Sequence, residues 1–256
     1  MYIEIENAGK TFTQNGETFR ALDRVSLSIE KGEFICLLGP SGCGKSTLLN
    51  AIAGFSPVNE GSIKIDGMEV VKPSTENVTI FQNYGLLPWR TVSKNVQLGL
   101  ESKKVSKAER KEIAEKYLEL VGLSEFKKSY PRQLSGGMQQ RVAIARALAV
   151  DPKIIFMDEP FGALDAITRM KLQDDILRIN KEQKKTIIFV THDIEEAIYL
   201  ADRIVVMTPN PGRVKKVVEV NLQQSRDRTS DDFLELRDKI FDIFNMKLKD
   251  AVEYYI

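Results

Sequence analysis

The run from Gly39 to Thr47, with the letters GPSGCGKST, constrains this chain most because it matches the pattern G-x-x-x-x-G-K-S. Gly42 and Gly44 would let the backbone curl so that successive N–H groups face one phosphate. Lys45 can reach the β- and γ-phosphates of a nucleotide, and the Ser46 hydroxyl can coordinate Mg²⁺. We therefore expect the bound nucleotide to contact Gly39, Pro40, Ser41, Gly42, Cys43, Gly44, Lys45, Ser46 and Thr47.

The segments on either side of this loop support the same interpretation. Residues 33–38 form an apolar run that is typical of a buried strand, and residues 46–53 carry leucine and isoleucine at helical spacing. A strand, a glycine-rich loop and a helix N-terminus, in this order, bind phosphate. The alternative, a glycine-rich turn without a ligand, is disfavoured by this context.

Two other apolar runs end in polar side chains. Residues 153–159 end in Asp158 and Glu159, and residues 186–191 end just before His192, the only histidine. A parallel sheet would bring these ends to the edge that carries the phosphate loop. There Asp158 would hold Mg²⁺, Glu159 would polarise a water, and His192 would contact phosphate. Such carboxylates are commonly only solvated and a lone histidine is more often structural, but the phosphate loop favours a catalytic interpretation.

Two segments keep two interpretations when they are judged from their residues alone. Residues 134–141 begin with small residues and continue as a helix, which predicts either a second anion site or a tight helix start without a ligand. Phe12 and Phe19 flank a polar turn at residues 14–17 and could stack on a nucleotide base, although their residue type favours a place in the core.

The remaining pattern predicts short strands, an inserted group of helices and a helical tail. Strands are expected at residues 2–5, 25–29, 61–66, 78–81, 203–207 and 214–220. A capping box of Ser106 and Glu109 predicts a helix that ends at Gly122 and buries Ile113, Tyr117, Leu118 and Val121. Ser230 is expected to cap a last helix, with one apolar side formed by Phe233, Leu236, Ile240, Phe241 and Phe244. Residues 82–90 form a loop whose apolar side chains, Leu86 to Trp89, serve either as an anchor or as a docking surface.

Composition limits the cellular setting. Lys and Arg (37) nearly balance Asp and Glu (36), so a broad attraction to nucleic acid or anionic lipid is not indicated. No apolar run approaches the ~20 residues that cross a bilayer, and the first residues show no secretory signal. Only Cys36 and Cys43 occur, one in a strand and one in the phosphate loop, so we expect no disulfide and a reducing compartment. The chain is expected to be a soluble cytoplasmic protein that reaches a membrane only through a partner.

Together these motifs, in this order, resemble the ATP-binding cassette family, the ATPase subunits of ABC transporters. Gly39–Thr47 resembles the Walker A motif, and Ile154–Asp158 with Glu159 resembles Walker B and the catalytic glutamate. The other matching positions are Gln82 for the Q-loop, Leu134, Ser135, Gly136 and Gly137 for the signature motif, Gly162 to Asp165 for the D-loop, and His192 for the switch histidine. Phe12 stands where the family places its adenine-stacking aromatic. Met138, where glutamine is commonest, is the one departure.

The resemblance implies an α/β fold, in which a P-loop NTPase (RecA-like) core carries an N-terminal antiparallel β subdomain and a helical subdomain inserted at about residues 83–152. It implies an ATPase domain over residues 1–220 and a C-terminal helical tail over residues 221–256. ATP and Mg²⁺ would be the cofactors, with Ser46, Gln82 and Asp158 as metal ligands. Two subunits would close head to tail, so that Ser135, Gly136 and Gly137 of one face the phosphate loop of the other and Asp165 couples the two sites.

Residues 86–92, 158–166 and 211–213 resemble the nitrate/sulfonate/taurine importer group. This implies a peripheral subunit at the cytoplasmic face of the membrane, which drives the uptake of a small anion through separate permease subunits contacted by the Gln82–Trp89 region. An extracytoplasmic solute-binding protein would be the third component, and no nucleic acid is involved. The alternatives are import of another small solute such as a thiamine-precursor pyrimidine, export, a soluble ABC ATPase of DNA repair or translation, and a module that binds nucleotide without hydrolysis.

Overall fold

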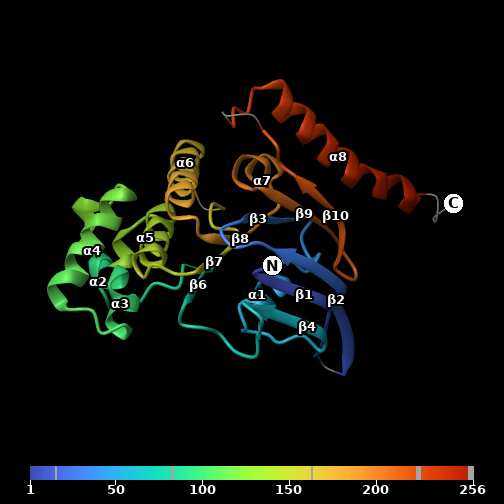
Figure 1. Ribbon diagram of the computed structural model, residues 1–256. Helices are drawn as coiled ribbons and strands as arrows, with labels where there is room; N and C mark the ends of the chain where they lie inside the picture. The colour runs from blue at the N-terminus through green and yellow to red at the C-terminus, as the bar shows by residue number, and fades with distance from the viewer. Residues whose placement is uncertain (15, 82–83, 163, 223–225, 253–256) are drawn as a thin grey trace.

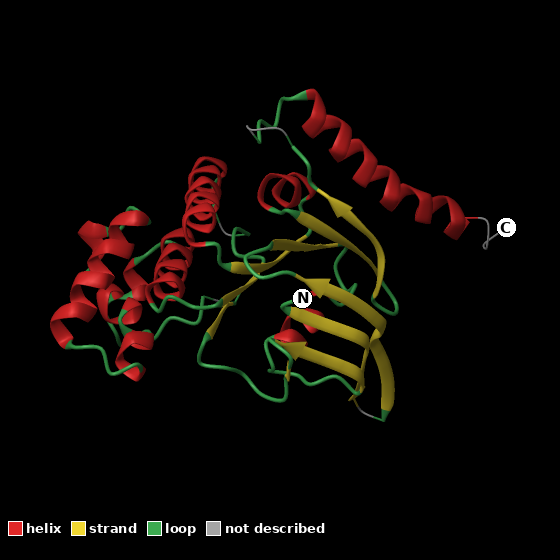
Figure 2. Ribbon diagram, viewed as in Figure 1, coloured by secondary structure: helices red, strands yellow, loops and turns green. Residues whose placement is uncertain are grey.

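The computed structural model describes residues 1–14, 16–81, 84–162, 164–222 and 226–252. Within these residues the main sheet has six strands, of which all neighbours are parallel except β9 and β10 (Figures 1 and 2). In spatial order they are β10 (Arg213–Glu219), β9 (Arg203–Thr208), β3 (Phe34–Leu38), β8 (Thr186–Thr191), β7 (Ile154–Asp158) and β6 (Asn77–Ile80).

β3 is central because it is apolar on both faces. Phe34, Cys36 and Leu38 lie in a core with residues of the helices that follow later in the chain, whereas Ile35 and Leu37 lie in a second core with the N-terminal strands. Successive side chains of a strand point to opposite faces, so a continuous apolar run can support two layers at once. The expectation of a buried strand here is confirmed.

An antiparallel sheet covers the second core, below the main sheet in Figure 2. Its order is β2 (Glu17–Ile29), β1 (Ile3–Gln14), β4 (Glu60–Ile65) and β5 (Met68–Glu69). β1 and β2 are much longer than expected, because their pairing continues to the turn and places Phe12 opposite Phe19. β5 was not expected, since two residues show no alternation. α1 (Lys45–Ile52) lies beneath the main sheet beside these strands (Figure 1).

A second group of helices lies at the β6 edge, on the left of Figure 1. The group consists of α2 (Val92–Val96), α3 (Leu98–Ser102), α4 (Lys107–Leu120) and α5 (Gly136–Ala149), with 3₁₀ turns at Ser124–Phe126 and Pro131–Gln133. The Ser106 hydroxyl accepts a hydrogen bond of 3.3 Å from the Glu109 N–H, which confirms the Ser106 half of the predicted capping box. Ile113, expected to be buried, is only half-buried. α2 and α3 were not expected, because five residues are too few to show a period.

The remaining helices are α6 (Ala166–Gln183), α7 (Ile194–Leu200) and α8 (Asp231–Val252). Ser230 caps α8 as expected, and Phe233 and Ile240 are fully buried. The prediction that Phe241 shares their apolar side is wrong, because Phe241 is 47% exposed. Among the described residues, no helix combines the length and the apolar character that crossing a membrane requires.

The turn between β9 and β10 packs closely against the backbone of the phosphate loop. The Gly212 N–H donates to the Ala21 carbonyl (3.0 Å), and the Gly212 carbonyl accepts from the Asp23 N–H (3.0 Å). A Cβ atom on Gly212 would lie 2.4 Å from the Cys43 carbonyl oxygen. Gly212 therefore lets the turn and the loop approach more closely than any other residue would allow.

We predict that Gly212→Ala displaces the phosphate loop, because the new methyl group collides with loop backbone. Nucleotide affinity should fall at least ~10-fold, and overpacking should lower the free energy of unfolding by about 1–3 kcal/mol. Isothermal titration with a nucleotide and urea unfolding measure the two effects. Gly67→Ala is the control for the collision, since its Cβ atom would meet nothing within 4 Å; because Gly67 has a positive φ of 73°, this variant adds backbone strain but no steric clash. Equal nucleotide affinity in both variants would contradict the support role of Gly212.

Candidate functional site

The pairing register of the parallel strands β3, β8 and β7 brings the candidate residues to one edge of the main sheet. Leu38 at the end of β3 pairs with Thr191 at the end of β8, and Asp158 at the end of β7 pairs with Val190. The phosphate loop, His192 and the Asp158–Glu159 pair therefore leave the sheet at the same level. The carboxyl edge of a parallel sheet is where such folds bind ligands.

The phosphate loop has the conformation expected of its glycines. Gly42 and Gly44 have positive φ angles of 78° and 88°, and Gly44 precedes α1 with no side chain capping the helix. Lys45 occupies the first position of α1, where the helix dipole disfavours a cation. Its ammonium group is buried and donates to the carbonyls of Gly39 (2.7 Å) and Pro40 (3.0 Å). Free N–H groups and a buried positive charge at a helix start favour an anionic ligand.

Ser46 and Asp158 form the candidate metal pair. The Ser46 hydroxyl donates to a carboxylate oxygen of Asp158 at 2.9 Å. Burial raises the pKa of Asp158 and the charge of Glu159 adds to this effect, whereas the Ser46 hydrogen bond and Lys45 oppose it. One hydroxyl and one carboxylate suit Mg²⁺, which binds few protein groups and takes its other ligands from phosphates and water. Gln82, the third predicted ligand, lies outside the described residues.

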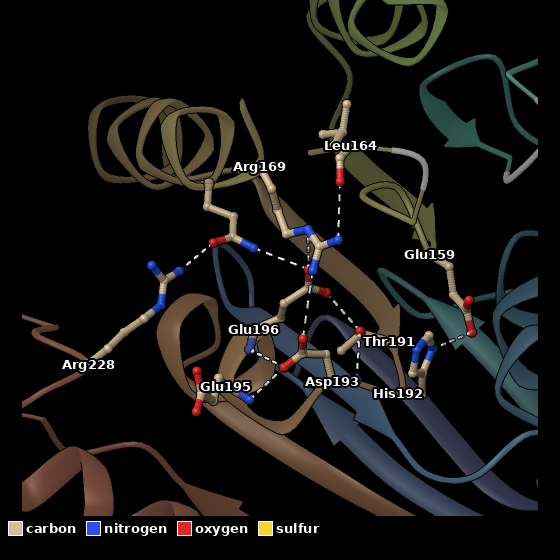
Figure 3. A network of polar contacts seen from close by, with 10 residues as sticks. Glu159, Leu164, Arg169, Thr191, His192, Asp193, Glu195, Glu196 and Arg228 are labelled. Atoms are coloured by element: carbon tan, nitrogen blue, oxygen red, sulfur yellow. Dashed lines mark hydrogen bonds and ion pairs between the residues drawn. The ribbon is translucent and has the colours of Figure 1, made fainter. Parts of the chain in front are cut away.

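Glu159 and His192 face each other beside this pair (Figure 3). The Nδ1 atom of His192 lies 3.3 Å from a carboxylate oxygen of Glu159. Glu159 has a positive φ of 46°, which is uncommon for a residue with a side chain, and its N–H donates to the Val190 carbonyl (3.0 Å). This hydrogen bond to β8 holds the strained backbone, and such strain clusters at functional sites.

Two predicted contacts of a nucleotide lie outside this cluster. Ser135 begins α5, and its hydroxyl accepts from the Met138 N–H at 3.3 Å. α5 packs with α2, α3 and α4 at the β6 edge, whereas α1 carries the phosphate loop (Figure 1). Asp165 likewise caps α6 by accepting from the Thr168 N–H at 3.0 Å, and this backbone hydrogen bond lowers the pKa of its carboxyl. Within the described residues, no hydrogen bond or ion pair joins Ser135 or Asp165 to Lys45, whose partners all lie in the phosphate loop.

Phe12 is a surface residue. It is 42% exposed, and Phe19 opposite it is 54% exposed. The Lys10 ammonium lies 5.2 Å from the centre of the Phe12 ring. The preference for a core position, drawn from residue type alone, is wrong, so the ring is free to contact a ligand.

The loop that precedes α2 has a buried anchor that the sequence did not reveal. Asn95 is fully buried, accepts from the Leu87 N–H (2.8 Å) and donates to the carbonyls of Leu87 and Arg90 (3.1 and 3.0 Å). Leu86 and Leu87 are half-buried, whereas Trp89 is 72% exposed. The loop thus uses part of its apolar surface as an anchor and presents the tryptophan outward.

A phosphate loop set against paired carboxylates at the carboxyl edge of a parallel sheet defines a P-loop nucleoside triphosphatase. Comparison with known proteins specifies the class further. Residues 22–162 match the ABC transporter family. The chain belongs to the ABC transporter family, and it is the ATPase component of a transporter of this kind.

Named relatives and a solved structure agree with this assignment. The aliphatic sulfonates import ATP-binding protein SsuB of Bacillus cereus is 48% identical over 246 residues, which are 95% of this chain and 96% of that protein. The nitrate import ATP-binding protein NrtD of Synechococcus elongatus is 44% identical over 230 residues (89% and 84%). A dimeric ATP-binding cassette, solved in a post-hydrolysis state bound to ADP and Pi, matches with a TM-score of 0.79 at 37% identity and covers 86% of this chain and 99% of that one.

We predict that Glu159→Gln slows ATP hydrolysis at least ~100-fold, because an amide cannot accept the proton of an attacking water. ATP affinity should be retained, since Lys45 and the loop N–H groups are unchanged. Steady-state phosphate release and equilibrium ATP binding give the two quantities. Glu195→Gln, an exposed neighbour on α7, is the matched control and should hydrolyse ATP normally. Near-normal turnover in Glu159→Gln would remove Glu159 from its assigned role.

Proposed function

We propose that this chain is the ATP-hydrolysing subunit of an importer, bound peripherally at the cytoplasmic face of the membrane, where it drives the uptake of a small anion. The observation that carries the proposal is the meeting of Lys45, the Ser46–Asp158 pair and the Glu159–His192 pair at one sheet edge. The printed functions of the relatives, sulfonate import and nitrate import, support the direction of transport and the class of cargo.

Each group at the edge has a role in this proposal. Lys45 and the N–H groups of residues 41–47 bind the β- and γ-phosphates, and Phe12 stacks on the adenine. Ser46, Gln82 and Asp158 hold Mg²⁺, which supplies positive charge to the phosphates when bound. Glu159 orients and deprotonates the attacking water, and His192 stabilises charge on the transferred phosphate. Charge stabilisation and positioning provide most of the catalysis in phosphoryl transfer.

We propose that the site is completed by a second cassette. In a head-to-tail pair, Ser135, Gly136 and Gly137 of one copy reach the γ-phosphate held by the other, and Asp165 of each copy lies at the shared interface. The dimeric state of the similar solved cassette supports this arrangement. The head-to-tail pair would also provide an anionic ligand for the N-terminal N–H groups of α5, which lie away from the phosphate loop of the same copy. ATP then stabilises the closed pair, and hydrolysis releases it.

The membrane partner would dock on the Gln82–Trp89 region. Trp89 is exposed while Asn95 fixes the loop backbone beneath it, so the surface is both apolar and rigid. Integral permease subunits would take this contact, and an extracytoplasmic solute-binding protein would deliver the solute. The balanced charge of the chain supports no nucleic-acid partner. In this organisation residues 1–220 are the ATPase domain, with a helical insertion at about 83–152, and residues 221–256 are a tail.

We predict that Ser135→Arg abolishes hydrolysis and leaves ATP binding by the single chain intact, because the bulky cation obstructs the site of the other copy. Ser106→Arg is the matched control. Both serines cap a helix of the same group through a 3.3 Å hydrogen bond, so both variants lose one cap. Phosphate release and ATP titration distinguish the variants. Unchanged turnover in Ser135→Arg, or equal loss in both, would contradict a site shared between two copies.

The proposed transport role is tested by isolating the tagged chain from detergent-solubilised native membranes and assaying ATP hydrolysis on the eluate. A polytopic protein should co-elute and raise turnover, and Trp89→Ala should reduce its recovery. A chain that is active only in the soluble fraction, with no membrane partner, would instead favour a soluble ABC ATPase.

A further inference from the structure

A line of polar contacts joins the C-terminal segment to the loop that carries His192 (Figure 3). The Arg228 guanidinium donates to the side-chain oxygen of Gln173 at 2.5 Å. The Gln173 amide donates to one carboxylate oxygen of Glu196 at 3.3 Å. The other carboxylate oxygen of Glu196 accepts from the Thr191 hydroxyl at 2.8 Å. Four side chains thus connect the tail, α6, α7 and the end of β8.

The inner members of this line are buried. Gln173 is 1% exposed, Thr191 is 2% exposed and Glu196 is 8% exposed. A buried polar group that loses its partner costs the protein its full desolvation penalty, so these contacts fix the side chains in one arrangement. The catalytic roles assigned above use none of the three.

Thr191 connects the line to the catalytic loop. Its hydroxyl group donates to Glu196, and the hydroxyl oxygen also accepts from the Asp193 N–H at 3.0 Å. Asp193 in turn accepts from the Glu196 N–H at 3.1 Å. The backbone is therefore fixed immediately before and immediately after His192. Glu196 is thus hydrogen-bonded to the residues on both sides of His192.

Arg169 extends the line to the segment that precedes Asp165. Its guanidinium lies 3.7 Å from Glu196 and 3.9 Å from Asp193, and it donates to the Leu164 carbonyl at 3.2 Å. Its Nε atom is buried without a hydrogen-bond partner in the part of the chain described. The Arg169 side chain is 33% exposed, and Glu196 is the nearest negative charge to its buried Nε atom.

The outer end of the line depends on how the tail docks. The Arg228 guanidinium lies 4.0 Å from the centre of the Tyr199 ring on α7. Arg226 donates to the carbonyls of Tyr199 and Ala201 at 2.8 and 2.9 Å, and Phe233 is fully buried. Separation of the tail from α7 would therefore remove the Arg228 contact to Gln173.

We propose that Gln173 and Glu196 are positioning residues for His192 and that the C-terminal segment sets the rate of ATP hydrolysis through Arg228. A docked tail holds the His192 loop against Glu159, and a displaced tail releases it. This inference rests on the role proposed for His192. It makes the tail a point at which a partner could slow hydrolysis without touching the nucleotide.

Arg228→Ala in the full chain tests the proposal, with Arg237→Ala as the matched control. Both variants remove one arginine contact between the tail and α7, but Arg237 pairs at 3.6 Å with Glu195, which lies outside the line. Arg228→Ala should lower kcat about three- to tenfold with KM for ATP unchanged, because the phosphate loop is untouched. Arg237→Ala should leave both unchanged. Equal kcat values in the two variants would overturn the proposal.

Two further readouts separate positioning from simple packing. In a His192→Ala background, Arg228→Ala should cause no further loss of kcat, since nothing remains to be positioned; a full additional loss overturns the proposal. Amide exchange at Asp193 should be faster in Arg228→Ala and unchanged in Arg237→Ala. If His192→Ala hydrolyses ATP normally, the catalytic role of His192 fails, and the exchange result alone then decides whether the tail controls this loop; unchanged exchange would refute that link.

Discussion

The parallel register of β3, β8 and β7 is the constraint on which the site depends. The last residues of β3, β8 and β7 pair within one residue of each other, so the chain leaves the same edge of the sheet after each of these three strands. A shift of one residue in any pairing would turn every side chain of that strand to the opposite face. It would exchange the two cores of β3 and separate Asp158 from Ser46. The apolar packing of the strands therefore determines the geometry of the candidate catalytic groups.

Electrostatics prepares this edge for an anion. Lys45 is buried at a helix start, where the dipole is unfavourable for it, and it is held by two loop carbonyls. Asp158 is half-buried beside Glu159, and burial raises its pKa. Both charges gain from a complex of phosphate and a divalent cation, since the phosphate neutralises the lysine and the cation neutralises the carboxylate. Because the site holds both a buried positive charge on Lys45 and a negative charge on Asp158, it favours a metal–nucleotide complex over the nucleotide or the metal ion alone.

Local chemistry explains which parts of the fold the sequence could predict. The glycine loop, the buried strands and the Ser106 cap depend on neighbouring residues and were predicted correctly. Phe12 and Phe241 were misjudged, because apolar residue type alone does not show which face of an element is covered. Asn95 and Gly212 were missed because their roles depend on segments brought close only by folding. The line from Arg228 to Thr191 joins the tail to α6, α7 and β8, and none of these segments alone carries a sequence pattern that predicts it.

The central claim is that the edge of the sheet is half of a site that closes around ATP. The most direct measurement is a structure of the Glu159→Gln variant with ATP and Mg²⁺. The account predicts two copies related head to tail, with the γ-phosphate between Lys45 of one copy and Ser135 to Gly137 of the other. It also predicts that the metal contacts Ser46 and Asp158. ATP bound to a single chain at a concentration that saturates the site, with residues 135–137 facing solvent, would contradict it.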